Sequence, residues 1–395
     1  MYRRYVIAYG CVLATFAMML LSNLLFLWRA GELMSADEVA AIQQSQPCLY
    51  APALRDATLR YKLAVLRRVQ PEIVAVGSSR ALQFQSAFFS GSFVNVGSTI
   101  KSVETGEGFV EEMLSISKPK ALIFTADFWW FNPALREDHL RASINPPATP
   151  SLYSPYMLTQ PVVWLFERKL SVRDYFDTLW HGRDKDGRCA IGVQALIQRE
   201  GLLNDGSYSY GSLISGEQAS KDARFRDTMA RMASDALELT HAQSADQNSL
   251  GQFMRIIDKL VAAGVQVIVV IPPVAPSVFT ALNDAGSDYH YIKDVRERLS
   301  QGLAERRVPF VDLHDPSSIE SPDCEFVDGL HGGAVTYARV TRRVQTVIDE
   351  SNVASLIDGV ALNAIIEQSA GLAAIQSSAS PIHEVDFLDL GCPKR

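Results

Sequence analysis

Short apolar runs alternate with helix-like segments along much of this chain, and this alternation restricts its fold more than any other feature. The apolar runs lie at 73–76, 93–96, 121–126, 265–271 and 309–313. Strands that alternate with helices are typical of β-α-β units, in which the strands run parallel to one another. The sequence therefore predicts an α/β fold with a five-stranded parallel sheet, and a helix is expected to begin at Arg80 directly after the first strand.

The alternation is interrupted between 128 and about 248 by aromatic-rich sequence with frequent Pro and Gly. Structureless loops of that length are uncommon in compact domains, so this insertion is expected to fold partly into helices, at 163–180 and 219–239. We expect the insertion to lie over the active edge of the sheet.

A long apolar segment at 5–28 follows Arg3 and Arg4. It exceeds the apolar core of a cleaved signal peptide, which favours one uncleaved transmembrane helix. The positive-inside rule then places the amino terminus in the cytoplasm and the remainder in the periplasm, as in a single-pass protein of the inner membrane. A long signal peptide cut near Ala36 is the alternative, and in both cases the domain is exported.

These observations divide the chain into an anchor, a linker with a lead-in helix, an α/β domain carrying the insertion, and a carboxyl-terminal helix with a tail. The predicted bounds are 1–30, 31–70, 71–350 and 351–395.

Charge and cysteine usage exclude several kinds of partner. The net charge is −7 and no basic run is present, which argues against nucleic acid. The cysteines show no zinc-site spacing, and we expect no metal and no cofactor. Four cysteines follow the anchor, an even number that allows two disulfides in an oxidising compartment with three possible pairings. They are Cys48, Cys189, Cys324 and Cys392.

Ser79 is the candidate nucleophile, because the Gly-Ser-Ser-Arg turn at 77–80 directly follows the first predicted strand. Ligands bind at the carboxyl edge of such sheets. A serine becomes nucleophilic when an imidazole accepts its proton, and the Asp-x-x-His segment at 328–331 offers His331 as the base and Asp328 to orient it.

Three other interpretations remain open. As an alternative, Ser79 would serve as an ordinary helix cap. His314 is a second candidate for the base, although it lacks an acid at the matching spacing. An α/β-hydrolase is the nearest alternative fold, but its nucleophile follows a later strand, and its acid and His lie on separate loops.

This layout resembles the SGNH, or GDSL-like, hydrolase superfamily over about half of the chain. The resemblance implies a three-layer, flavodoxin-like fold with nucleophile Ser79, and the Gly-Ser-Ser form is similar to that of the membrane-anchored branch. It also implies that the backbone amides of Ser79 and Gly97 hold the oxyanion, because Asn-Val-Gly at 95–97 matches the second sequence block of the superfamily.

The third block of the superfamily, Gly-x-Asn-Asp, is absent. The third strand is followed instead by Asp127, and Asn132 is the nearest asparagine that would complete an oxyanion site. Arg80, Asp127, Trp129 and Trp130 are candidate substrate-binding residues, because a cation suits an anionic group and flat aromatic faces suit sugar rings or acyl chains. Core packing is the alternative for the two tryptophans.

Membrane-anchored relatives of this type include alginate-type O-acetylation proteins and the D-alanyl transfer protein of lipoteichoic acid. The resemblance implies an extracytoplasmic O-acyltransferase that modifies a cell-envelope or exported polysaccharide, with a membrane-bound acyltransferase as its partner. An esterase of the same fold and a non-catalytic glycan-binding scaffold are the alternatives.

Overall fold

The structure is a computed structural model that describes residues 2–136, 155–185, 188–348, 353–376 and 383–394. The chain forms two compact units. The first contains residues 1–57 and 148–204, and the second contains residues 58–147 and 205–395. Each unit is described separately below.

The second unit is built on a five-stranded sheet in which all strands are parallel. Its strands are β2 (Ile73–Val76), β3 (Phe93–Val96), β4 (Ala121–Thr125), β9 (Gln266–Ile271) and β10 (Phe310–Asp312). Their order is β10-β9-β4-β2-β3. The predicted α/β class and parallel sheet are therefore confirmed. Numbered along the chain, this is the 2-1-3-4-5 order of doubly wound sheets.

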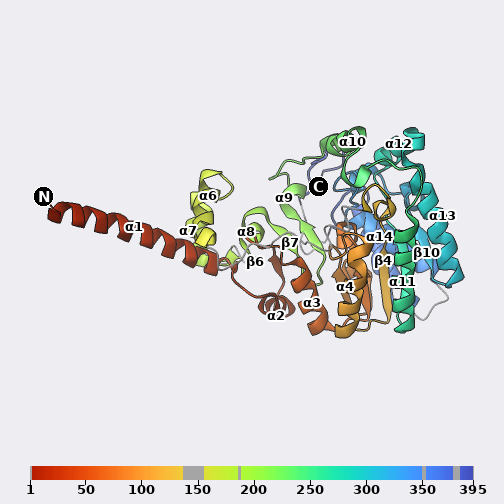
Figure 1. The fold of residues 1–395 in the computed structure, drawn as a ribbon, viewed down its shortest axis with the longest axis horizontal. Coiled ribbons are helices and arrows are strands. Elements are labelled where there is room, and N and C mark those ends of the chain that lie inside the picture. The colour runs from red at the N-terminus through yellow and green to blue at the C-terminus, as the bar shows by residue number, and fades with distance from the viewer. Residues whose placement is uncertain (1, 137–154, 186–187, 349–352, 377–382, 395) are drawn as a thin grey trace. The chain divides into compact units, whose positions relative to one another are not determined.

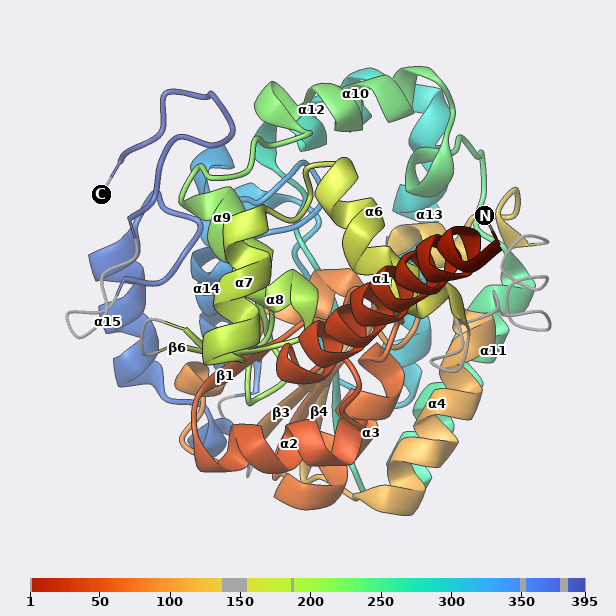
Figure 2. The ribbon, with the colours of Figure 1, turned by 90° about the vertical axis from the view of Figure 1, so that its left-hand side faces the viewer.

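Helices cover both faces of this sheet, which explains why β2 and β4, inside the sheet, consist almost entirely of apolar residues. One face packs against α3 (Thr58–Val69), α4 (Val103–Ile116), α11 (Gln247–Ala262) and α13 (His290–Glu305). The other face packs against α14 (Ala334–Val347), with α15 (Gly359–Ser369) beyond it. Figure 2 shows β3 and β4 between these two helical layers.

The helix predicted to begin at Arg80 is absent as such, and the chain forms two short 3-10 helices instead. These are η1 (Ser79–Gln83) and η2 (Ser86–Phe88). The side-chain amide of Asn95 donates to the carbonyls of Ala81 and Phe84, both at 2.8 Å. These carbonyls are thus satisfied without the N–H groups of a following α-helical turn, so the helix ends early.

The first unit begins with α1 (Tyr2–Arg29), which is long and apolar enough to cross a membrane. After it come α2 (Ala36–Ser45), β1 (Cys48–Tyr50), α6 (Gln160–Phe166), α7 (Val172–His181), β5 (Asp184–Lys185), β6 (Arg188–Ile191), α8 (Val193–Gln198) and β7 (Glu200–Leu202). The strands pair in the order β5-β6-β1-β7. Cys48 and Cys189 face each other in the β1–β6 register and form a disulfide. Figure 1 shows the course of the chain.

The region predicted as an insertion contributes to both units. Residues 148–204 belong to the first unit, and residues 205–248 to the second. The helix predicted at 163–180 is two helices, α6 and α7, because the chain turns at 167–171 and Ser171 caps α7. Residues 137–154 and the predicted boundary at 350 lie outside the described residues.

The remaining elements of the second unit are short, and most lie between β4 and α11 or next to β9. They include η3 (Phe128–Phe131), β8 (Tyr208–Tyr210), α9 (Gly211–Ile214), α10 (Arg226–Ala233) and α12 (Pro276–Asp284), together with further short 3-10 helices. A second disulfide joins Cys324 to Cys392 in the tail, so the structure selects one of the three pairings that the sequence left open.

Candidate active site

Ser79 lies where the strand order reverses. The chain passes from β2 to β3 on one side and then returns to β4 on the other side of β2, and Ser79 follows β2 at its carboxyl end. Gly77 makes the turn possible: its φ is +151°, and a Cβ there would lie 1.8 Å from Thr125 Oγ1. A ligand site is expected at such a switch point in doubly wound sheets.

The structure brings together the three residues that the sequence predicted as a catalytic set. His331 Nδ1 lies 2.9 Å from both carboxylate oxygens of Asp328, and its Nε2 lies 2.8 Å from Ser79 Oγ. A carboxylate only accepts hydrogen bonds, so Nδ1 carries the proton and Nε2 accepts from the serine hydroxyl. This is the orientation that a general base requires.

The negative charge of Asp328 raises the pKa of the His331 imidazole. Burial alone would lower the pKa of His331, but the neighbouring carboxylate outweighs it, and the pKa is raised from its ordinary value. Burial opposes ionisation of Asp328, yet His331 and the backbone amides of Leu330 and His331 lower its pKa to about 2. The carboxylate is therefore ionised at neutral pH and stabilises the imidazolium that forms during proton transfer.

The loop that carries Asp328 and His331 is anchored by Asp222, which sequence reasoning missed. The Asp222 carboxylate accepts the backbone N–H of Gly329 at 2.9 Å, the N–H of Thr228 at 2.9 Å, and the hydroxyl of Thr228 at 2.7 Å. A Cβ on Gly329 would lie 2.7 Å from the Thr228 side chain, so this close approach requires glycine. No local pattern marks Asp222, because Gly329 is 107 residues away.

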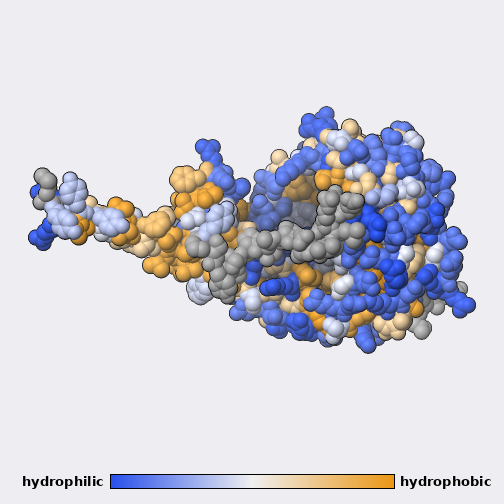
Figure 3. Space-filling view, viewed as in Figure 1, coloured by the Kyte–Doolittle hydropathy of each residue, from blue (hydrophilic) through white to orange (hydrophobic). Residues whose placement is uncertain are grey.

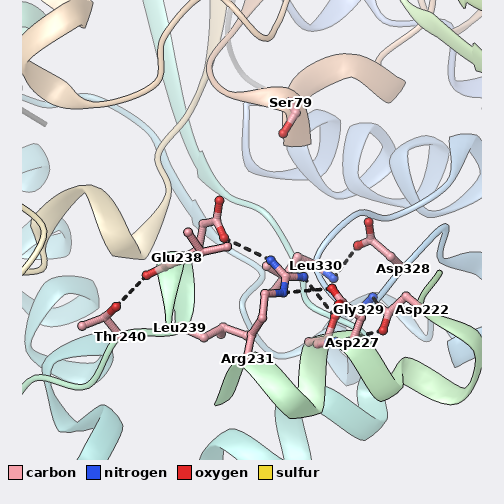
Figure 4. Close-up of polar contacts among 12 residues, drawn as sticks. Ser79, Asp222, Asp227, Arg231, Glu238, Leu239, Thr240, Asp328, Gly329 and Leu330 are labelled. Atoms are coloured by element: carbon pink, nitrogen blue, oxygen red, sulfur yellow. Dashed lines mark hydrogen bonds and ion pairs between the residues drawn. The ribbon is translucent and has the colours of Figure 1, made fainter. Parts of the chain in front are cut away.

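Figure 4 shows this anchor, with Asp222, Gly329 and Asp328 close together and Ser79 above them. Arg231 of α10 forms ion pairs with Asp227 and Glu238, which links the two ends of the segment that follows Asp222. Part of the predicted insertion thus supports the acid–histidine loop directly.

Arg80 and Asp127 form an internal ion pair, with 3.2 Å between Nη1 and Oδ1 and no exposed surface on either side chain. The Arg80 guanidinium also donates to the carbonyls of Pro272 and Pro273. Burial raises the pKa of Asp127, and Arg80 offsets this only in part. In this arrangement the two residues join η1 to the ends of β4 and β9 rather than facing a substrate.

The two tryptophans and Asn132 are also internal. Trp129 is 6% exposed and lies under the Arg80 guanidinium, and Trp130 is 1% exposed and packs against Phe124. The core-packing alternative therefore describes both rings. Asn132 donates from its amide to the Thr240 carbonyl at 2.6 Å, so this donor points to a different part of the chain.

Gly97 has a different partner from the one predicted. Its N–H donates to Asn95 Oδ1 at 2.7 Å, and a Cβ at this position would lie 2.9 Å from Ala81 Cβ. The glycine thus allows the turn after β3 to pack closely on η1. The amide of Ser79 remains a candidate oxyanion donor, because the first N–H groups of a helix have no partner within it.

Lys62 of α3 contacts the backbone just before the turn at Gly97, and it is completely buried. Its ammonium donates to the carbonyl of Asn95 at 2.9 Å and to the carbonyl of Gly206. Burial lowers its pKa to about 7, although the negative charge of Asp205 opposes the shift. The neutral amine is therefore populated near physiological pH.

His314 is buried among aromatic rings and has no hydrogen bond to Ser79. It is 3% exposed and its ring packs edge-on against Phe128 and Phe279. Burial lowers its pKa to about 3, so it remains neutral. His331, not His314, is therefore the imidazole that reaches Ser79. In the part of the chain that the structure describes, no group of three or more His, Cys, Asp or Glu residues is arranged to hold a metal.

No protein-family model matches this chain, and no curated protein matches it either. The inference about function therefore depends on the geometry above and on the sequence motifs.

Proposed function

We propose that this protein is a serine-dependent acyltransferase. One observation carries the proposal: the hydrogen-bonded chain from Ser79 through His331 to Asp328 at the switch point of a parallel sheet. Nucleophile, base and orienting acid are within hydrogen-bond distance and in the required order.

The reaction divides into two half-reactions. Ser79 Oγ attacks the acyl carbonyl while its proton passes to His331 Nε2. Collapse of the tetrahedral intermediate breaks the bond to the leaving group, which takes that proton and leaves an acyl-serine. An acceptor hydroxyl then attacks the acyl-serine, His331 takes its proton and returns it to Ser79, and the acceptor departs as an ester.

The charges around α1 and the disulfides support an extracytoplasmic acceptor. Arg3 and Arg4 precede the apolar part of α1, whereas Glu32 and Asp37 follow it, which favours a cytoplasmic amino terminus and a periplasmic domain. Two disulfides suit an oxidising compartment. Together with the resemblance to membrane-anchored SGNH proteins, this points to a polysaccharide acceptor and an acyl donor supplied by a membrane-bound acyltransferase.

Ester hydrolysis is the second candidate. The side chains of His331 and Asp328 are 24% and 29% exposed, so water has access to the edge of the site. Water and a sugar hydroxyl attack the same acyl-serine, and the outcome depends on which one is excluded.

Labelling with a fluorophosphonate tests the proposed nucleophile. Full-length protein in detergent is expected to be labelled at Ser79, as identified by mass spectrometry of the modified peptide, and Ser79→Ala and His331→Ala are expected to abolish labelling. Ser86→Ala is the matched control, because Ser86 is an exposed serine in the next 3-10 helix. A folded protein that labels equally in all four forms contradicts the proposal.

A second measurement separates transfer from hydrolysis. After acylation with p-nitrophenyl acetate, release of free acetate and formation of acetylated oligosaccharide are measured together. Rising acceptor concentration is expected to divert acetyl groups from water to the sugar. Acetate as the sole product at every acceptor concentration favours the esterase. Unchanged acylation of envelope polysaccharide in cells carrying Ser79→Ala contradicts the acyltransferase role.

A further inference from the structure

Helices α6 and α7 pack against the carboxyl-terminal part of α1 within the first unit. Tyr175 of α7 stacks on Phe26 with 4.8 Å between ring centroids, and its hydroxyl lies 2.7 Å from Ser22 Oγ. Asn23 donates to the carbonyl of Leu158 just before α6. These polar and aromatic contacts fix the helix pair to the last two turns of the apolar helix.

The outer face of the pair is apolar and exposed. Val172, Phe176 and Trp180 are 64%, 53% and 77% exposed, and their spacing of four residues places them on one stripe of α7. Phe166, at the end of α6, is 85% exposed. Large exposed apolar patches are uncommon on soluble domains and mark an interaction surface.

This patch continues an apolar surface that already belongs to α1. Leu24, Leu25 and Trp28, at the same end of α1, are 38%, 48% and 63% exposed. Figure 3 shows hydrophobic residues over both the carboxyl-terminal half of α1 and the neighbouring helices. The environment that covers α1 is therefore the natural candidate to cover the α6–α7 face.

The length of α1 favours a position of the helix pair at the membrane surface. A helix of 28 residues is about 42 Å long, whereas the hydrocarbon core is about 30 Å thick. Part of α1 therefore lies outside the hydrocarbon core, and we expect this part to include its last turns, which contact α7. Figures 1 and 2 together show α6 and α7 lying across the direction of α1, which is the orientation of helices in the plane of a membrane.

We propose that α6 and α7 form an interfacial helix pair that inserts Phe166, Val172, Phe176 and Trp180 into the bilayer crossed by α1. Trp and Phe suit this depth, where apolar and polar layers meet. This inference is independent of the chemistry at Ser79. The first unit would then contact the membrane through the α6–α7 pair as well as through α1.

Apolar insertion, rather than attraction to anionic lipid, is expected to drive the contact. Cations lie beside the stripe, but Lys169 forms an ion pair with Glu167 and Arg173 with Asp177. The local charge is therefore largely balanced. A zwitterionic phosphatidylcholine vesicle is thus sufficient to test the proposal.

Spin labels report the environment of the stripe directly. Full-length protein carrying Cys11→Ser and either Phe176→Cys or Trp180→Cys is reconstituted in phosphatidylcholine vesicles with its disulfides intact. Glu297→Cys, at an exposed position of α13, is the control for water. Labels at 176 and 180 are expected to collide more with dissolved oxygen and less with a water-soluble nickel complex than the label at 297.

Two outcomes overturn the proposal. Nickel accessibility at 176 and 180 equal to that at 297 places the stripe in water. Exclusion of both reagents shows that protein, such as a second copy of this chain, covers the stripe.

Quenching by brominated lipids provides a second test with a conservative variant. Trp28 and Trp180 are exposed, whereas Trp129 and Trp130 are buried. The fluorescence of the wild type is expected to be quenched more strongly than that of Trp180→Phe. Equal quenching of the two proteins contradicts insertion of α7, because Trp28 and the half-buried Trp164 of α6 would then account for the signal.

Discussion

Replacing Asp328 by Asn tests the proposed role of the carboxylate with little change in shape. Asp328 Oδ1 accepts the N–H groups of Leu330 and His331, both at 2.8 Å, and Asn retains this oxygen. The new NH₂ group, however, replaces Oδ2, which lies 2.9 Å from His331 Nδ1, and two donors cannot bond to each other. Oδ1 lies at the same distance from Nδ1 but already accepts the two backbone N–H groups. The imidazole is therefore expected to move its proton to Nε2, which then donates to Ser79 instead of accepting from it.

The expected loss is large for reactivity and small for stability. A base locked in the wrong tautomer lowers the rate by about 10⁴-fold, which corresponds to about 5.5 kcal/mol in activation free energy. The fold loses one charge-assisted hydrogen bond and keeps the two backbone contacts, so the free energy of unfolding is expected to fall by about 1–3 kcal/mol.

The assay is the second-order rate constant for fluorophosphonate labelling of the full-length protein in detergent, measured beside urea unfolding. Asp323→Asn is the matched control. Asp323 is also a carboxylate that receives a backbone N–H and a hydroxyl, both from Ser277, but it does not contact His331. A rate for Asp328→Asn within tenfold of the wild type, on a folded protein, would refute the assigned role.

Three further predictions follow from the same contacts. The labelling rate is expected to rise with pH as His331 loses its proton, and the midpoint of this rise should lie above the ordinary histidine pKa of 6.5. Asp328→Asn is expected to move the midpoint to lower pH. A series of labelling rate constants measured across pH checks both expectations. Asp222→Ala leaves three donors without their acceptor, so the free energy of unfolding in urea is expected to fall by about 3 kcal/mol or more. Labelling is expected to become slower, because the Gly329 backbone loses its hydrogen bond. An unchanged labelling rate would show that this anchor is dispensable. The pKa of Lys62 is about 7 in the folded protein, compared with the ordinary value of 10.5 in the unfolded chain. The unfolded chain therefore binds more protons between these two values, and the free energy of unfolding is expected to rise with pH from 7 to 10. Lys62→Met should lose this rise, as measured by unfolding midpoints across the same pH range.

The parallel sheet was predictable because buried strands are continuous apolar runs, and the observed bounds of β2 and β3 equal the predicted ones. The helix after Ser79 was not predictable, because the side chain that ends it, Asn95, belongs to the next strand. A local pattern contains no information about a hydrogen bond from a distant segment.

Some of the predicted site residues could be identified from local motifs, whereas the positions of others depended on tertiary packing. Ser79, Asp328 and His331 were identifiable because each follows a local motif whose position relative to a strand or helix is visible in the sequence. Arg80 and Trp129 have the composition of a binding surface, but tertiary packing places them inside. Gly97 lies in the predicted turn, yet the Asn95 side chain takes its amide.

The sequence by itself determined the α/β class, the parallel strands, the apolar helix at the amino terminus and the motifs that carry the candidate chemistry, because all of these depend on residues adjacent in the chain. Only the tertiary structure decided which cysteines pair, how the insertion is shared between two units, that Asp222 holds the acid–histidine loop, and that α6 and α7 present an apolar face beside α1. These features arise from contacts between residues far apart in sequence, and the geometry of such contacts is fixed only when the whole chain is packed.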